Sequence, residues 1–485
     1  MELALVIDAA LSEPLHQQVY SQLRWAILSG RLVSGQRLPA SRTLARTLGL
    51  SRTTVTQGYD QLISEGYLQT RRGAGTYVCA QLPEMLLEAD EPVKSSPQPV
   101  VKAPLSDYGK RVKQVSLSPL RESYEISFRY GHPALDLFPV ELWRKLLSKH
   151  CRETKQWLNY AGETLGYWPL RKAVAHYLQH ARAVRCMHDQ VIITNGSQQA
   201  LSLITQLLVN PDDSVAIEEP GYRGARHIFK ASGANLLPMP LDHDGLMVDT
   251  LLAYDNPPRL VYVTPSHQFP TGALLSLPRR LALLQWAWRT GALIIEDDYD
   301  SEYRYGGRPI PSLQGLDNHS SVLYVGTFSK VMFPSIRLGY LVVPQSLVEV
   351  FGKAKWLADR QPPTLTQYAL AEFISAGHLE RHIRKMRLCY EHRRRALLQA
   401  LYKYFGQEVK ILGDSAGLHV MAKLPLSFRD DEVVARAARV GVEICSACIQ
   451  YEVPRNTGEF VFGYTDLTEE QIEEGIHRVA KALWT

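Results

Sequence analysis

Residues 321–340 read SVLYVGTFSKVMFPSIRLGY, and this stretch decides the fold class. The run Val322–Val325 is continuously apolar and is followed by a glycine, a pattern typical of a buried strand in a parallel sheet. Ligands of open α/β sheets bind beyond the carboxyl ends of such strands. Lys330 follows this strand closely. We therefore predict that its amine faces a pocket.

Polar residues near Lys330 indicate what the pocket binds. Thr327 and Ser329 stand beside the lysine, and Arg337 follows it by seven positions. An amine can form a Schiff base with an aldehyde, while hydroxyls and a guanidinium can hold a phosphate. Pyridoxal 5′-phosphate (PLP) carries both groups. A lone lysine after a strand is more often a surface residue, so this interpretation depends on further motifs.

Residues 292–300, ALIIEDDYD, form a second apolar strand that ends in acids. Asp297 and Tyr299 are two positions apart, so they share a face of an extended chain. PLP needs a carboxylate that keeps its pyridine nitrogen protonated, because the protonated ring is an electron sink. A solvated acidic turn and a divalent-metal site are alternatives. The metal ligands would be Glu296, Asp297, Asp298 and Asp300. Since adjacent carboxylates on a strand point to opposite faces, we predict no metal site.

Two further motifs come earlier in the chain. In Val191–Leu208, the strand VIIT turns through Asn-Gly-Ser into an amphipathic helix. The free amides at that helix start, together with Ser197, predict an anion site, although an ordinary capped helix has the same pattern. In Ile217–Tyr222, IEEPGY, the tyrosine follows a strand and a Pro-Gly turn. Its ring could stack on a planar cofactor or belong to the core.

The chain from about Tyr124 to the C-terminus resembles a fold-type-I PLP enzyme of the aminotransferase superfamily. The motifs that carry the resemblance are, in order, NGSQQAL, EEPGY, TPSHQFPTG, EDDYDSEYRY, GTFSK and RLGY. The resemblance implies an α/β domain with a mixed, mostly parallel sheet between helices. It also implies a smaller C-terminal α/β subdomain.

The resemblance implies a role for each motif residue. Lys330 would be the catalytic, Schiff-base lysine, Asp297 the partner of the pyridine nitrogen, and Tyr299 a neighbour of the ring hydroxyl. Tyr222 would stack on the ring. The phosphate would be held by Ser197, Gln198, Thr327, Ser329 and Arg337. Tyr160 matches a tyrosine that reaches the neighbouring subunit's phosphate, which implies a site shared across a dimer.

Two departures from the family pattern matter. The family's Asn-Pro-Thr-Gly turn appears as Phe269–Gly272, so one ring contact is missing or rerouted through His267 or Gln268. The arginine that clamps a substrate α-carboxylate is absent from Glu443–Tyr451, where we expect it. Arg455, in a predicted turn, is the nearest candidate. Because a guanidinium binds carboxylate in a way that no apolar residue can, ordinary amino-acid transamination is in doubt.

The N-terminal segment has a different character. Residues 14–29 show helical spacing of apolar residues, at Leu15, Val19, Leu23, Ala26 and Ile27. Ser41 is predicted to cap a short helix over Arg42–Leu48, and Gly-Leu then makes a tight turn. Ser51 is predicted to cap a second helix over Arg52–Glu65. Its apolar side would carry Val55, Tyr59, Leu62 and Ile63. Two short helices joined by a glycine turn predict a helix-turn-helix.

A basic hairpin completes this pattern. Tyr67–Val78 predicts a β-hairpin with Arg71–Gly75 at its tip. Residues 37–78 contain six arginines and only two acids. A positive charge excess of this kind is attracted to a phosphate backbone. The segment 11–79 resembles the winged helix-turn-helix domain of the GntR family. The predicted contacts to operator DNA are Arg42, Ser51, Arg52, Thr53, Thr54, Arg71, Arg72, Gly73 and Thr76.

The two resemblances together identify the chain as similar to the MocR/GabR-type regulators. These proteins join a GntR-like DNA-binding domain to an aminotransferase-like effector domain. We predict domains at residues 1–79 and 122–485, with a Pro-rich linker at 80–121. About 40 extended residues could span on the order of 100 Å. The family resemblance implies a head-to-tail homodimer.

Composition agrees with a multidomain chain that works in a reducing compartment. The 485 residues favour more than one domain, and 45% hydrophobic residues allow a large core. The net charge of +5 is modest, so the whole chain is not a polycation. The six cysteines are scattered, which favours the cytoplasm. We see no signal peptide and no membrane-length apolar stretch.

Two classes of function remain open from the sequence. In the first, the protein is a PLP-dependent transcription regulator that senses a small amine or PLP itself. In the second, it is a working aminotransferase with an accessory DNA-binding domain. The missing carboxylate arginine favours the first class, whereas the intact Lys330, Asp297 and Tyr299 permit the second. The effector, the operator and the direction of regulation are not encoded in recognisable motifs.

Overall fold

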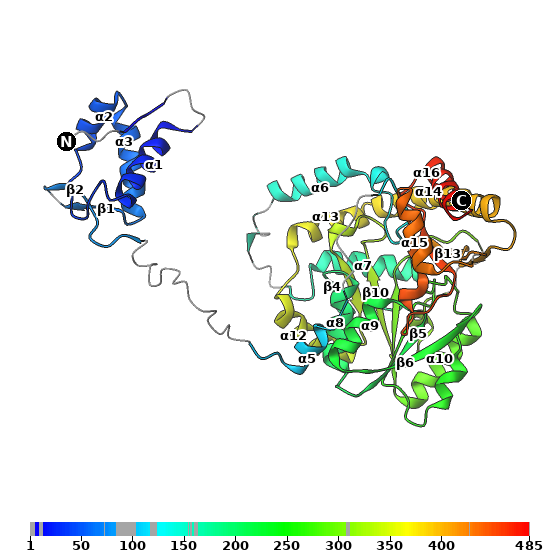
Figure 1. Cartoon of the computed structure of the whole chain (residues 1–485). Helices are drawn as coiled ribbons and strands as arrows, with labels where there is room; N and C mark the ends of the chain where they lie inside the picture. The colour runs from blue at the N-terminus through cyan, green and yellow to red at the C-terminus, as the bar shows by residue number, and fades with distance from the viewer. Residues whose placement is uncertain are drawn as a thin grey trace. The chain divides into compact units, whose positions relative to one another are not determined.

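The computed structural model describes residues 5–8, 13–71, 73–83, 103–116, 124–153, 155, 158–159, 163–306, 311–425 and 427–484. The chain divides into two compact units, Met1–Pro104 and Leu105–Thr485 (Figure 1). Arg72 and Tyr160, both predicted site residues, lie outside the described residues.

The N-terminal unit is a winged helix-turn-helix, as the sequence predicts. Its elements are α1 (Leu15–Leu28), α2 (Ser41–Leu48), α3 (Arg52–Ser64), β1 (Leu68–Arg71) and β2 (Gly75–Val78). The two strands form an antiparallel hairpin in which Leu68 pairs with Val78. Val19 and Leu23 of α1 pack with Val55 and Leu62 of α3 in one apolar core. The apolar spacing of both helices therefore forms the centre of the unit.

The turn between α2 and α3 positions the second helix. Gly49 ends α2 with a φ of 68°, a left-handed conformation that glycine adopts without strain. Ser51 caps α3 because its side chain accepts a hydrogen bond from the Thr54 amide, which confirms the predicted cap. The predicted Ser41 cap is wrong. Helix α2 begins at Ser41 itself, after Ala40, and no side chain caps it.

The second unit is built on an eight-stranded sheet with the order β4-β11-β10-β9-β8-β5-β6-β7. The strands are β4 (Val191–Thr194), β5 (Ser214–Glu219), β6 (Asn235–Asp242), β7 (Gly245–Leu246), β8 (Leu260–Val263), β9 (Leu293–Asp298), β10 (Val322–Thr327) and β11 (Gly339–Val342). Strands β10, β9, β8, β5 and β6 run parallel, whereas β11 is antiparallel to both neighbours. The predicted mixed, mostly parallel sheet is confirmed.

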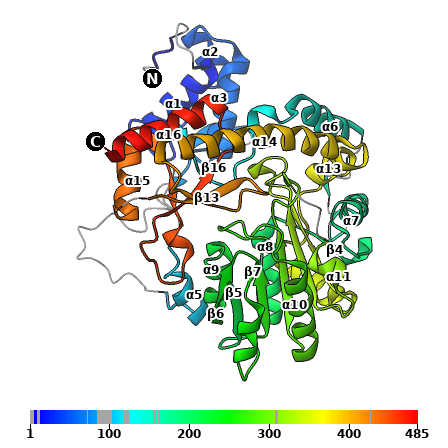
Figure 2. The ribbon, with the colours of Figure 1, turned by 90° about the vertical axis from the view of Figure 1, so that its right-hand side faces the viewer.

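Helices cover both faces of this sheet (Figure 2). They include α7 (Trp168–Arg182), α8 (Ser197–Leu208), α9 (Arg223–Ser232), α10 (Leu277–Thr290), α11 (Leu313–Leu316) and α12 (Val348–Asp359). Alternation along β10 explains why the strand is apolar throughout. Leu323 and Val325 pack in a core with α8 and α9, while Val322 packs in another core with α10. Both faces of the strand are therefore buried, as a central parallel strand requires.

A smaller C-terminal subdomain carries an antiparallel sheet with the order β12-β13-β16-β15. Its strands are β12 (Lys410–Leu412), β13 (His419–Lys423), β15 (Cys445–Ser446) and β16 (Glu459–Gly463). A separate parallel pair is formed by β3 (Ile126–Ser127) and β14 (Val442–Glu443). The remaining helices are α6 (Val140–Glu153), α13 (Thr364–Ser375), α14 (His378–Phe405), α15 (Asp430–Arg439) and α16 (Glu469–Trp484). Among the described residues, no helix is both long and apolar enough to cross a membrane.

One part of the predicted linker is folded. Helix α5 (Asp107–Val112) belongs to the second unit, and Ser106 caps it by accepting a hydrogen bond from the Gly109 amide. Arg111 donates hydrogen bonds to the carbonyl oxygens of Ala231 and Ser232 at the end of α9. Within the segment predicted as a linker, residues 80–121, this helix therefore packs against the second unit, and proline content alone does not predict such contacts. The domain boundaries stay predictions.

Candidate functional site

A cavity in the second unit lies beside the carboxyl ends of β9 and β10. It is lined by Tyr130, Gly131, Ser197, Tyr222, Tyr262, Thr264, Phe269, Asp297, Tyr299, Thr327, Lys330, Leu418 and His419. Six of the residues predicted from the sequence are in this lining: Ser197, Tyr222, Asp297, Tyr299, Thr327 and Lys330. The structure therefore brings together motifs that are scattered over more than 130 positions of the chain.

Lys330 presents its amine at the cavity. Its Nζ donates a hydrogen bond to the Gly131 carbonyl oxygen at 2.8 Å. Burial lowers the pKa of this amine, although Asp300 and Asp297 act in the opposite direction. A Cβ atom on Gly131 would lie 2.5 Å from the Lys330 Nζ, and the φ of Gly131 is 79°. The positive φ favours glycine at position 131, and the absence of a Cβ there leaves room for the amine. Because burial lowers its pKa, this amine loses its proton more readily and is a better nucleophile.

Asp297 has one oxygen in use and one without a partner. Its Oδ2 accepts a hydrogen bond from the Tyr262 hydroxyl at 2.7 Å. Its Oδ1 is buried and has no hydrogen-bond partner among the described residues. Burial raises the pKa of Asp297 to about 7. Since buried polar atoms are almost always paired, this oxygen is suited to an N–H group of a ligand, such as a protonated pyridine nitrogen.

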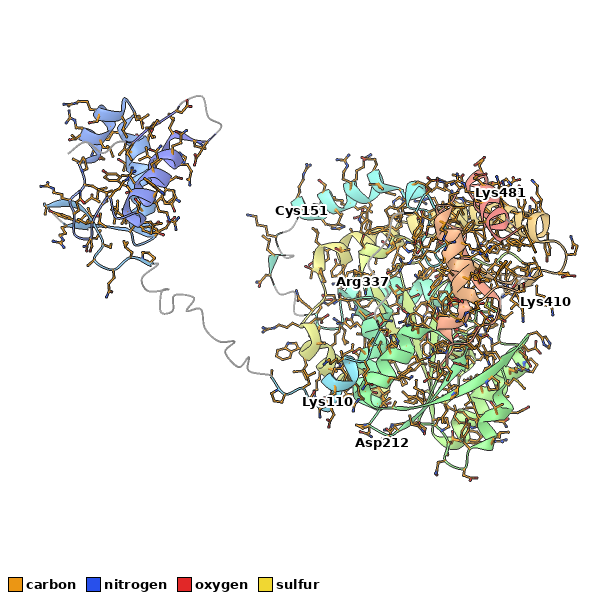
Figure 3. All side chains as sticks on the ribbon, viewed as in Figure 1. Lys110, Cys151, Asp212, Arg337, Lys410 and Lys481 are labelled. Atoms are coloured by element: carbon orange, nitrogen blue, oxygen red, sulfur yellow. The ribbon has the colours of Figure 1, made fainter. Side chains whose placement is uncertain are left out.

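The predicted phosphate-binding residues differ in how they are placed. Ser197 is the first residue of α8, so it adds a hydroxyl to the free amides of that helix start. Ser329 Oγ is buried without a hydrogen-bond partner among the described residues. Arg337, labelled in Figure 3, is exposed and donates to the Asn195 carbonyl oxygen at 2.9 Å. Gln198 instead donates to the Tyr222 hydroxyl at 2.9 Å and is positioned to orient that ring.

The other acids of the 292–300 motif do not converge on one point. Glu296 accepts hydrogen bonds from the backbone amides of Leu313 and Gln314. Asp298 forms an ion pair with Arg182 at 2.7 Å. Asp300 turns in another direction, toward His267. The four carboxylates therefore have different hydrogen-bond or ion-pair partners.

The two departures from the family pattern have structural counterparts. The ring of Phe269 stands in the lining and packs on Tyr130, with ring centroids 4.9 Å apart. The side chain of Gln268 is already hydrogen-bonded. It accepts from Thr271 in its own turn and donates to the Pro220 carbonyl oxygen. No arginine is in the described lining of the cavity. Arg455 lies elsewhere, over the ring of Tyr451 at 4.1 Å.

Sequence reasoning missed several lining residues. Tyr130, Tyr262, Leu418 and His419 come from a loop, from β8 and from the edge of the C-terminal subdomain. Tyr262 lies in the apolar strand LVYV, and a polar hydroxyl in a wholly buried strand could have indicated it. The others carry no local signal, because only the packing of the C-terminal subdomain brings them to the cavity.

The predicted DNA-binding residues lie on the surface of the first unit. Arg42, Ser51, Arg52, Thr53, Arg71 and Gly73 are exposed, while Thr54 and Thr76 are partly buried. The Thr54 hydroxyl is 2.8 Å from the Ser51 hydroxyl, so both belong to the cap of α3. The guanidinium of Arg71 lies over the Tyr77 ring at 4.8 Å, which holds it on the wing. Arg52 and Thr53 open α3, the helix that would enter a major groove.

Both units match known families. The family of bacterial regulatory proteins called gntR matches residues 15–78, and aminotransferase class I and II matches residues 127–479. The probable rhizopine catabolism regulatory protein MocR of Rhizobium meliloti is 38% identical over 99% of this chain and 95% of its own length. The pyridoxine biosynthesis regulator PdxR of Corynebacterium glutamicum is 32% identical over 96% of this chain and 95% of its own.

The chain belongs to the MocR-type transcriptional regulators. The aminotransferase-like part of this MocR-type regulator is also similar to enzymes. The structure of the multiple substrate aminotransferase from Thermococcus profundus has a TM-score of 0.72 at 29% identity, covering 78% of this chain and 97% of that chain. The class I and II aminotransferase family binds PLP, and the unpartnered oxygens of Asp297 and Ser329 beside Lys330 are suited to that cofactor.

Proposed function

We propose that this regulator binds PLP through Lys330 and that the occupancy of the cavity controls its binding to operator DNA. The observation that carries the proposal is the buried, unpartnered Asp297 Oδ1 in the same cavity as the Lys330 amine. A site with an unpaired buried carboxylate oxygen is costly unless a ligand pairs it. A protonated ring nitrogen is such a ligand.

Different residues would contact different parts of PLP. Lys330 would attach its aldehyde carbon, Asp297 would hold the ring nitrogen protonated, and Tyr222 would stack on the ring. The phosphate would be bound by Ser197, Thr327, Ser329 and Arg337, with Gln198 supporting Tyr222. When bound, PLP supplies an aldehyde that reacts reversibly with primary amines. Tyr160 of a second subunit would complete the site in a head-to-tail homodimer.

The cavity favours an effector without an α-carboxylate. Its lining has no arginine among the described residues, and Phe269 and Leu418 are apolar. A carboxylate placed there would lose hydration without gaining a guanidinium partner. We therefore propose PLP itself, or an amine recognised through other groups, as the signal. DNA binding implies that the protein acts in the cytoplasm.

A second candidate function is catalytic transamination with DNA binding as an accessory. The cavity holds Lys330, Asp297 and Tyr299 together, which favours it. The aromatic-amino-acid aminotransferase 1 of Thermococcus litoralis is 31% identical over 79% of this chain and 96% of its own length. Purified protein incubated with amino acids and a keto acid distinguishes the two. Many turnovers would support the enzyme, and a single half-reaction would support the sensor.

The proposal is tested by operator affinity in three states: without PLP, with PLP, and with PLP plus a panel of amines. Operator fragments would first be selected from genomic DNA with the full-length protein. We expect PLP to change the affinity or the footprint, and one class of amine to change it again. Equal affinity and equal footprints in all states would contradict the proposed sensor. A response to common α-amino acids at low concentration would contradict the effector class and direct attention to Arg455.

A further inference from the structure

A buried histidine and carboxylate stand directly behind Tyr299. The Nδ1 of His267 is 3.0 Å from Asp300 Oδ2 and 3.1 Å from the Tyr299 hydroxyl. Both His267 and Asp300 are almost completely buried, at 2% and 1% exposure. The same Asp300 oxygen accepts the backbone N–H of Leu418 at 3.2 Å. His267 and Asp300 are outside the cavity lining, whereas Tyr299 is in it.

The ring of His267 has little freedom to turn. A Cβ atom on Gly417 would lie 2.2 Å from its Nδ1, and a Cβ on Gly272 would lie 2.8 Å from its Nε2. Both glycines have positive φ, at 80° and 69°. The Gly413 carbonyl oxygen lies 3.4 Å from Nε2. The backbone on two sides therefore fixes the ring plane, and with it the position of Nδ1 between Asp300 and Tyr299.

Charge decides which atom carries the proton. Burial alone would lower the pKa of His267, but the Asp300 carboxylate beside it raises the pKa above its ordinary value. A carboxylate accepts and cannot donate when ionised, so the Nδ1 hydrogen points to Asp300 and is shared with the Tyr299 oxygen. The phenol oxygen is then an acceptor from His267. Its own hydrogen is left to point away from His267, toward the cavity.

We propose that His267 and Asp300 are positioning residues that hold the Tyr299 hydroxyl as a hydrogen-bond donor into the cavity. This inference rests on the proposed function, because the acceptor would be the ring oxygen of bound PLP. Phe269, which occupies the turn beside His267, has no hydrogen-bond donor in its side chain. The direction of the Tyr299 hydrogen therefore matters more here than it would if an amide also faced the ring.

A metal site is the other interpretation of this cluster. His267, Asp300 and His419 form the only group of three such donors within the described part of the chain. Three of the four ring nitrogens already have polar contacts: His267 Nδ1 with Asp300, His267 Nε2 with the Gly413 carbonyl oxygen, and His419 Nε2 with the Pro270 carbonyl oxygen at 3.1 Å. The cluster is therefore better described as a hydrogen-bond network.

The test uses the visible absorption of the full-length, PLP-loaded protein as a function of pH. A donor to the ring oxygen stabilises negative charge there and favours loss of the neighbouring proton on the nitrogen bonded to the cofactor. Losing the donor should therefore raise the pH midpoint of the spectral change. We expect a rise of about one pH unit for His267→Leu and Asp300→Asn, the size of one hydrogen bond to a charged group.

Matched variants separate positioning from structural damage. An asparagine amide can place a donor near the position of Nδ1, so His267→Asn should keep the wild-type midpoint. Tyr299→Phe should raise the midpoint, and adding His267→Leu to it should cause no further rise. Thermal unfolding of each variant shows whether it is folded, and Asp300→Asn provides the result if His267→Leu does not fold.

The outcomes are distinguishable. If the pH midpoint of the spectral change is the same in His267→Leu and Asp300→Asn as in the wild type, and PLP is bound normally, this inference alone is overturned. An additional rise from His267→Leu in the Tyr299→Phe background also overturns it, because His267 would then act independently of Tyr299. A wild-type protein with no visible band and no PLP uptake overturns the inference together with the proposed function.

Discussion

The two candidate sites of this chain are built in opposite ways. Around the cavity, Asp297 and Lys330 are held by neighbours, through Tyr262 and the Gly131 carbonyl oxygen. On the winged unit, Arg52 is exposed and opens a helix at the surface. A small ligand gains from groups that are already in position. DNA supplies a dense row of charges, so long and mobile cations are sufficient for affinity.

The largest effect is expected at Lys330. Lys330→Ala removes the amine, so covalent attachment of PLP should be lost completely, while weaker binding persists through ring and phosphate contacts. Borohydride reduction and peptide mapping measure this, with Lys353→Ala as a control on an exposed lysine that pairs with Glu349. A label on any peptide other than the one containing Lys330 would mean that the cavity is not the covalent site.

Replacing Asp297 by asparagine should have opposite effects on PLP binding and on the stability of the ligand-free protein. Asp297→Asn should weaken PLP binding, because the ring nitrogen loses its anionic partner. The folded-state pKa of about 7 is above the ordinary aspartate pKa of 3.8, so the folded protein binds more protons and its stability should fall as pH rises between these values. Asp297→Asn should reduce that loss in the ligand-free protein, by the share that Asp297 contributes beside Glu218, Glu296 and Glu302, whose pKa values burial also raises to about 7.

Thermal unfolding from pH 4 to 8 without PLP measures the second effect, and PLP titration measures the first. A stability profile of Asp297→Asn that parallels the wild type would show that another carboxylate causes the pH dependence. Glu218 is the first to examine, since burial raises its pKa to about 7 as well.

A smaller effect is expected on the exposed site. If Arg52 reads a base edge, Arg52→Ala should cost about 1–3 kcal/mol of operator binding and relax specificity at one position. Loss of Arg72 should lower affinity more evenly across sequences and flatten the salt dependence. Operator titrations at several salt concentrations distinguish the two. Unchanged operator affinity in the triple variant of Arg52, Arg71 and Arg72 would contradict the assigned DNA-binding face.

The smallest effect is expected at the N-terminal cap of α3, the helix that carries Arg52. Ser51→Ala removes the cap of α3 and should destabilise the winged unit by about 1 kcal/mol. Ser41→Ala is the matched control, because Ser41 lies inside α2 and caps nothing. Denaturant unfolding of the full chain, followed by a probe in the first unit, compares them. Equal losses for the two serines would mean that the Ser51 hydrogen bond contributes nothing.

The sequence predicts the parts of each site that depend on local patterns, and it misses the parts that depend on packing between distant segments. Strand β10 and the helix starts at Ser51 and Ser197 depend on local patterns, and they lie where the sequence predicts them. The Ser41 cap prediction failed because α2 begins one residue earlier than predicted, so Ser41 lies in the first turn of the helix and does not precede it. Tyr130 and His419 were missed because packing between distant segments brings them to the cavity. Their partners cannot be read from spacing along the chain.

In the proposed homodimer, the anchored helix α5 would also limit how far apart two operator half-sites can be. Arg111 ties the segment to the end of α9, and Arg223 at the start of α9 donates to the Ser116 carbonyl oxygen. Leu82 packs against the core of the winged unit, so the linker predicted from the sequence shortens from roughly 40 residues to roughly 20, over 84–104. Extended as polyproline II, it would span about 65 Å. In the proposed homodimer, two such linkers would limit the half-site spacing, and operators with longer spacing between the half-sites could reveal that limit.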